Sequence, residues 1–182
     1  MVAPNSADAV AAAIVAPAMG RMVAGLKPRG FTWVITDRLA VSDRVGGSGF
    51  QHRRVRREEE ITWLVEEGGI NTIVSMLPGN QNLTAYRQAG IATYSVPVAN
   101  PIESEDIGRF FVTLDKALDR SHARVLVHRE VIDDTVGGLL GGYLVMSGLL
   151  EDPILALAVI QQILGRALGP DGRSLIPAAS TS

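Results

Sequence analysis

Short apolar runs alternate along the chain with stretches that have the length and spacing of helices. Five runs are rich in β-branched residues or bounded by turn residues, which is typical of short strands: 31–35, 39–41, 71–77, 91–98 and 124–128. The expected helices cover 56–67, 81–89, 104–121, 136–150 and 153–168. Strands that alternate with helices favour a parallel sheet with helices on both faces, so the pattern predicts an α/β fold.

The same pattern divides the chain into three parts. Residues 1–30 form an alanine-rich arm, residues 31–168 one domain, and residues 169–182 a C-terminal tail with the composition of a loose end. We expect the domain to be a three-layer α/β/α structure around a central, mostly parallel sheet.

The composition supports one domain with a sizeable core. The chain has 182 residues, of which 47% are hydrophobic and 20% are charged. The formal net charge of −2 gives no general attraction to nucleic acid or to an anionic membrane. The chain contains no cysteine, so disulfides, thiolate metal sites and a thiol nucleophile are excluded.

Two apolar segments raise the question of a leader or a membrane span. The N-terminal segment lacks the positively charged start of a secretory signal, so we interpret it as an arm. The window 136–150 is shorter than the roughly 20 residues that span a bilayer. Its glycine pairs, Gly137/Gly141 and Gly138/Gly142, are typical of close packing, and we expect them to lie against the sheet. The sequence therefore predicts no membrane span.

The candidate site lies where the strands end. Ligands of α/β sheets bind beyond the carboxyl ends of strands, which directs attention to the residues after Val98 and after His128. A buried strand ending at His128 is followed by a seven-residue turn and a glycine-bearing helix. Backbone N–H groups and the helix N-terminus would converge there, so this segment has the outline of an anion cradle.

This segment resembles the dual-specificity phosphatase branch of the protein tyrosine phosphatase superfamily. In that family a strand ending Val-Leu-Val-His precedes cysteine, five residues, arginine, a hydroxyl residue and glycine. This chain has Val-Leu-Val-His at 125–128, seven residues at 129–135, and then Val136 and Gly137. Similar pieces occur in the same order elsewhere: 33–35, 39–42, 69–77, 90–98 and 165–166.

The resemblance also shows what this chain lacks. Arg129 stands at the position of the nucleophilic cysteine, Thr135 at that of the phosphate-binding arginine, and Asn100 at that of the general acid. An arginine is always protonated and cannot attack, and an amide cannot donate the proton that the leaving group needs. The resemblance therefore implies a phosphatase site without catalytic residues. The former phosphate-loop positions are His128, Arg129, Glu130, Val131, Ile132, Asp133, Asp134 and Thr135.

Three carboxylates lie in or beside this turn. Asp133 and Asp134 precede the helix, where acids cap free N–H groups and complement the helix dipole. We expect Arg129 to pair with one of the acids, which would oppose the binding of phosphate. The same acids leave open an alternative in which the loop binds a divalent metal.

Other charged residues have simpler interpretations. Arg53, Arg54, Arg56 and Arg57 form a basic run that three glutamates follow at once, so a solvated helix start with a possible protein partner is favoured over nucleic acid. The acids at 103, 105 and 106 are expected to cap a helix. The acids at 37 and 43 are interpreted as turn residues, while position 63 is either a half-buried tryptophan or an exposed anchor.

These observations predict a catalytically inactive phosphatase-like protein that acts through protein–protein interaction. It would serve as a scaffold, a subunit of a complex or a competitor for a phosphorylated target, with a protein partner or a second copy of itself. The alternative is an enzyme or a small-ligand or anion-binding protein that reuses the former phosphate loop. We expect no cofactor, no bound metal and no nucleic-acid partner, and a cytoplasmic location.

Overall fold

The computed structural model describes residues 22–51, 53–79 and 81–177. In this part of the chain a five-stranded sheet has the order β1-β2-β5-β3-β4. Strand β1 is antiparallel to β2, and the other neighbouring strands are parallel, so the predicted mostly parallel sheet is confirmed. The strands are β1 (Thr32–Ile35), β2 (Leu39–Ser42), β3 (Thr72–Ser75), β4 (Ala92–Ser95) and β5 (Val125–His128).

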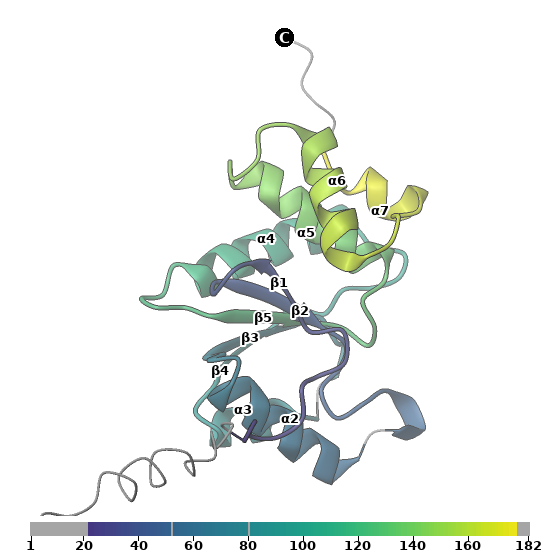
Figure 1. The fold of residues 1–182 in the computed structure, drawn as a ribbon. Coiled ribbons are helices and arrows are strands. Elements are labelled where there is room, and N and C mark those ends of the chain that lie inside the picture. Colours follow the sequence, from purple (N-terminus) through teal and green to yellow (C-terminus); the bar gives the residue numbers. More distant parts are fainter. Residues whose placement is uncertain (1–21, 52, 80, 178–182) are drawn as a thin grey trace, which may run out of the picture.

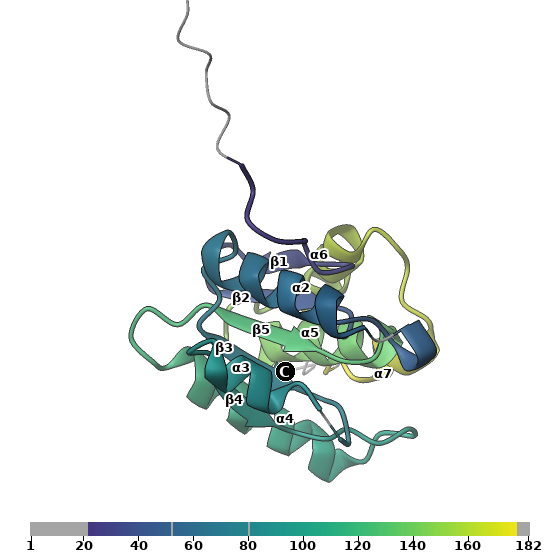
Figure 2. The same cartoon turned by 90° about the horizontal axis from the view of Figure 1, so that it is seen from below.

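Helices cover both faces of the sheet, which confirms the α/β/α layers (Figure 1). One face carries α2 (Arg54–Glu66) and α3 (Leu83–Gln88), which Figure 2 shows in front of the strands. A short 3-10 helix, η1 (Gly49–Gln51), precedes α2. The helices on the other face are α4 (Ser104–Leu118), α5 (Asp134–Met146), α6 (Pro153–Leu164) and α7 (Pro170–Ser174).

The central strand β5 shows why the sheet is buried on both sides. Val125 and Val127 belong to the core beneath the helices of the α4–α7 side, whereas Leu126 belongs to the core beneath α2 and α3. Alternation along a strand sends successive side chains to opposite faces, so a continuous apolar run serves two cores. His128 ends this run and is buried as well.

The glycines of α5 contact the C-terminal part of the chain rather than the sheet. A Cβ atom on Gly137 would lie 2.6 Å from Leu168 Cδ2, and one on Gly138 would lie 2.9 Å from the Gly172 Cα atom. Larger side chains of the same helix, Leu139 and Leu140, join the core that includes the strand valines. The expectation that the glycines lie against the sheet is therefore wrong: they let α6 and α7 approach.

The C-terminal tail is packed as far as residue 177. Helix α6 ends at Leu164, earlier than predicted, because Gly165 takes a left-handed φ of 67°. The following segment folds back as α7 on α5, where Gly172 is buried and Ile176 is only 8% exposed. The expectation of a loose end is wrong for residues 169–177, because the Ile176 side chain packs against α5 at Gly141. Residues 178–182 lie outside the described part.

The described part of the N-terminal arm runs along α2. The Ala24 N–H donates to Glu67 Oε1 at 3.0 Å, and the Leu26 N–H donates to the Glu59 carbonyl at 3.1 Å. Trp63 of α2 packs edge-on against Phe31 with ring centroids 4.9 Å apart, so it is a half-buried packing residue. Residues 1–21, which include most of the predicted arm, lie outside the described residues.

Among the residues that the structure describes, none of the helices combines the length and the apolar character needed to cross a lipid bilayer.

Candidate functional site

The carboxyl ends of three parallel strands carry a buried polar row. Ser42, His128 and Ser75 are partners in register across β2, β5 and β3, and each is fully buried. The alternation of the strands turns them toward α2 and α3, where His128 Nε2 lies 3.5 Å from the hydroxyl of Tyr86. Burial, and next the positive charge of Arg44, lower the pKa of His128 to about 4. The imidazole is therefore neutral at pH 7.

The loop after His128 is bridged by Arg129. Its guanidinium donates to Asp133 Oδ2 at 2.7 Å and to the Val98 carbonyl at 3.3 Å. The Arg129 side chain is only 12% exposed, whereas that of Asp133 is 37% exposed, so the guanidinium is largely buried and the carboxylate is still in contact with water. Asp133 Oδ1 also accepts the Val136 N–H at 3.0 Å, which caps α5. Both the predicted cap and the predicted arginine–carboxylate pair are confirmed.

The other two carboxylates of the loop are also held by arginines. Glu130 Oε2 accepts from Arg44 Nη1 at 3.1 Å, and its second oxygen accepts the Gly49 N–H at 3.2 Å. Asp134 accepts from Arg166 Nη1 at 2.6 Å and from the Gly169 N–H at 2.7 Å. These hydrogen bonds, the one from Arg166 above all, lower the pKa of the Asp134 carboxyl.

Asp43 belongs to the site and is not simply a turn residue. Its Oδ1 accepts the Ile132 N–H at 2.9 Å, so a carboxylate already occupies one of the backbone donors of the loop. Arg29 lies 3.6 Å from its other oxygen. Because β2 runs parallel to β5, the end of β2 lies beside His128. The rule that ligands bind at strand ends could therefore have identified Asp43 and Arg44 from the sequence.

An open pocket of about 580 Å³ lies beside the loop. It brings together Asn100, Arg109 and Arg129, all of which line it, with apolar residues between them. Asp106 also lines it: this carboxylate accepts the Ala99 N–H at 3.3 Å and pairs with Arg109, which lowers its pKa. The expected cap of α4 is present at Asp106, whose carboxylate also accepts from the backbone N–H of the N-cap residue Glu103, and the same side chain turns back to hold the preceding loop.

The arginine and carboxylate charges around the cradle balance each other. Five pairs carry this balance: Arg29–Asp43, Arg44–Glu130, Arg109–Asp106, Arg129–Asp133 and Arg166–Asp134. Since every guanidinium here already has a carboxylate, the cradle offers an incoming anion no excess of positive charge. Val131 and Thr135 of the loop add no charge to the cradle. Val131 is 49% exposed, and Thr135 is partly buried in the first turn of α5.

The described residues contain no group of three histidine, aspartate or glutamate side chains placed to hold a metal ion. The geometry gives the reason at the loop. Glu130, Asp133 and Asp134 each face a different arginine at 3.1 Å or less, so their oxygens point to separate partners. A metal would have to displace those arginines before it could share the carboxylates.

The predicted basic run starts α2, and its Arg56 lines a small cavity together with the cradle residues Asp43, Arg44 and Glu130. Arg54 pairs with Glu58 and Arg56 with Glu60, each at 2.7 Å, as the spacing of four residues predicts. Arg53 is exposed.

Comparisons with known proteins were made for sequence and for structure. No protein-family model and no curated protein matches this chain. Solved structures do match. The core catalytic domain of the PP-IP phosphatase Siw14 from S. cerevisiae, in complex with citrate, is 15% identical with a TM-score of 0.61, over 84% of this chain and 86% of that one.

Two further phosphatases are similar to this chain in structure. Kinase associated phosphatase, with its catalytic cysteine substituted by serine, is 16% identical with a TM-score of 0.62, over 82% of this chain and 93% of that one. Human DUSP28 is 19% identical with a TM-score of 0.56, over 82% and 92% of the two chains. The chain thus has the fold of dual-specificity and related tyrosine phosphatases, and it contains no cysteine.

Proposed function

We propose that this chain, a phosphatase fold without a cysteine, is catalytically inactive and acts by binding another protein. In the proposed correspondence Arg129 takes the place of the nucleophile, Thr135 that of the phosphate-binding arginine and Asn100 that of the general acid. None of these three side chains can perform the step that its position requires. The retained framework then serves recognition, as a scaffold, a complex subunit or a competitor for a phosphorylated target.

The observation that carries the proposal is the neutralised cradle. Arg129 is largely buried and engaged by Asp133, and Arg44 is engaged by Glu130. A phosphate dianion would have to separate these pairs or lie beside their carboxylates, and either costs free energy. Asp43 also holds the Ile132 N–H, which removes a backbone donor.

The alternative, an enzyme that uses the same loop with a divalent metal, has less support. The loop acids Glu130, Asp133 and Asp134 are each bound to an arginine. His128 is fully buried, and its Nε2 faces the hydroxyl of Tyr86. We therefore place the function on the surface of the protein rather than in the loop.

The first experiment measures hydrolysis of 4-nitrophenyl phosphate by the purified chain. We expect no rate above the buffer blank. A measurable rate that Arg129→Ala abolishes would refute the proposal.

A second experiment tests the neutralised cradle itself by thermal shift with tungstate. The wild-type chain should show no shift at millimolar tungstate. The double variant Glu130→Gln/Asp133→Asn keeps acceptors for the Gly49 and Val136 N–H groups but removes two negative charges, so it should gain a shift of several degrees. Micromolar tungstate binding by the wild type would contradict the neutralisation argument. Sedimentation velocity then separates a self-associating chain from one that needs a foreign partner.

A further inference from the structure

A groove lined by apolar residues, two arginines and one glutamate lies beside the first half of α2. Its volume is about 510 Å³, and it is lined by Leu26, Arg53, Val55, Arg56 and Glu59. Leu26 is 45% exposed and Val55 is 66% exposed, although both are large apolar side chains. The arm holds the groove in place, because the Leu26 N–H donates to the Glu59 carbonyl at 3.1 Å.

The start of α2 carries one more arginine than glutamate, since Arg53, Arg54, Arg56 and Arg57 precede Glu58, Glu59 and Glu60, and Glu59 itself lines the groove. Helix α2 has no acidic residue in its first turn, and its N-cap residue, Arg53, makes no side-chain cap hydrogen bond. Arg56 is paired with the buried Glu60, and Arg54, whose side chain is 82% exposed, pairs with Glu58. Such an exposed pair contributes little and leaves Arg54 available to a partner. No carboxylate lies within ion-pair distance of Arg53 among the described residues.

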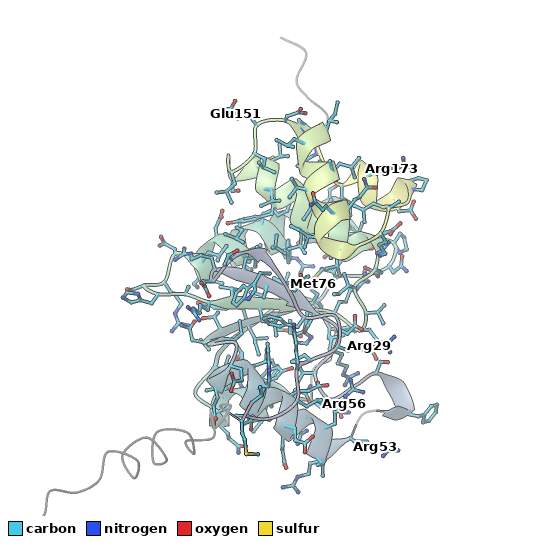
Figure 3. The ribbon with its side chains drawn as sticks, viewed as in Figure 1. Arg29, Arg53, Arg56, Met76, Glu151 and Arg173 are labelled. Atoms are coloured by element: carbon cyan, nitrogen blue, oxygen red, sulfur yellow. The ribbon has the colours of Figure 1, made fainter. Side chains whose placement is uncertain are left out.

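The groove adjoins the cradle. Arg56 also lines a small cavity that it shares with Arg29 and Arg44 and with the carboxylates of Asp43 and Glu130, which pair with those two arginines. The Arg29 side chain is 78% exposed. Figure 3 shows Arg29, Arg53 and Arg56 along one flank of the molecule, with Arg173 far away on α7.

We propose that this groove binds an acidic segment of a protein partner that places an apolar side chain between Leu26 and Val55. The inference rests on the proposed protein-binding function and names the chemistry of the partner. Charge complementarity favours carboxylates beside Arg53 and Arg54, and the exposed apolar floor favours a hydrophobic anchor over a purely ionic ligand. Nucleic acid fits less well, because none of the described residues that line the groove has an aromatic side chain on which a base could stack.

The test is fluorescence anisotropy of the full chain with the labelled peptide Glu-Glu-Leu-Glu-Glu. We expect saturable binding that weakens when sodium chloride rises from 50 to 200 mM, since exposed charges are screened. The peptide Glu-Glu-Ser-Glu-Glu, which lacks the apolar anchor, should bind at least about threefold more weakly, because roughly 0.65 kcal/mol corresponds to that ratio and a buried leucine contributes more. The peptide Lys-Lys-Leu-Lys-Lys should not bind.

Matched variants locate the binding site. Arg53→Glu should weaken binding of the acidic peptide about tenfold or more, because it replaces attraction by repulsion at the groove wall. Arg173→Glu changes the net charge equally at an exposed site on α7 and should stay within about twofold of the wild type. Val55→Ser should weaken binding, whereas Val112→Ser, at a comparably exposed valine of α4, should not. Circular dichroism confirms that each variant is folded.

Four outcomes would overturn the inference: no binding of the acidic peptide at 1 mM, equal loss in Arg53→Glu and Arg173→Glu, tighter binding of a ten-nucleotide oligothymidylate, or tighter binding of phosphatidylserine vesicles. None of these outcomes bears on whether the cradle is inactive. The proposed lack of catalysis fails only by phosphate hydrolysis, so the two failures are distinguishable.

Discussion

Acidification should destabilise this protein through one buried residue, His128. The side chain is fully buried at the end of β5, and its pKa is lowered to about 4 from an ordinary value of 6.5. Burial is the main cause, because the charged imidazolium would lose its hydration, and the nearby Arg44 adds repulsion. In the unfolded chain the same imidazole becomes protonated below about pH 6.5.

The sign and the size of the effect follow from linkage. Between about pH 6.5 and pH 4 the unfolded chain binds a proton at His128 that the folded chain does not, so the free energy of unfolding falls as the pH falls. The full displacement of the pKa corresponds to about 3 kcal/mol. From pH 7 to pH 5 the loss comes to about 2 kcal/mol, because the folded state is still almost entirely neutral at pH 5.

Urea unfolding of the wild type and of His128→Gln at pH 7 and pH 5 measures this effect. Glutamine cannot titrate, so the variant retains only the pH dependence of the remaining groups, and the two losses should differ by about 2 kcal/mol. Any general loss of stability in the variant cancels, because each protein is compared with itself at two pH values. If both proteins lose the same free energy to within about 0.5 kcal/mol, the buried-histidine reasoning is wrong.

Three further predictions test packing and polar contacts. Gly138→Ala should lower the free energy of unfolding by about 1–3 kcal/mol, since its methyl group would meet the backbone of α7. Gly108→Ala has open space around it and should raise the free energy of unfolding by about 0.5–1 kcal/mol. Urea titrations measure both changes. Glu60→Ala should lower the free energy of unfolding by about 2–3 kcal/mol in the same assay, because this buried carboxylate accepts from a backbone N–H and from an arginine. Glu58→Ala removes a carboxylate from an exposed ion pair and should change the free energy of unfolding little. Asp134→Ala should speed amide hydrogen exchange in the connection between α6 and α7, and unchanged protection there would contradict the role assigned to its carboxylate.

Much of the fold could be predicted from local patterns. The valine-rich run at 125–128 is apolar on both faces, and such a run indicates an inner strand of a parallel sheet wherever it lies. Asp133 precedes the helix by the spacing of a cap, and the cap is present. A pair of Arg129 with one of the loop acids could also be predicted, because they belong to one short turn, and the structure shows that the partner is Asp133.

The rest of the candidate site depended on residues distant in the sequence. Arg44 lies 86 positions from Glu130, and Asp43 lies 89 positions from Ile132, yet each pair is in hydrogen-bond contact. The strand-end rule marks Asp43 as a candidate, but nothing local shows which segment its side chain meets. The contact arises because β2 lies next to β5 in the sheet, although β3 and β4 separate them along the chain.

By itself the sequence determined the strand–loop–helix segment at His128 and the absence of any cysteine, since these depend on neighbouring residues and on composition. Only the tertiary structure decided which carboxylate pairs with which arginine. It also decided that α7 packs against the glycines of α5. The physical reason is the range of the interactions. Periodicity and caps act within a few residues, whereas ion pairs across the cradle and the fit of α7 on α5 exist only once the sheet order has brought distant segments together.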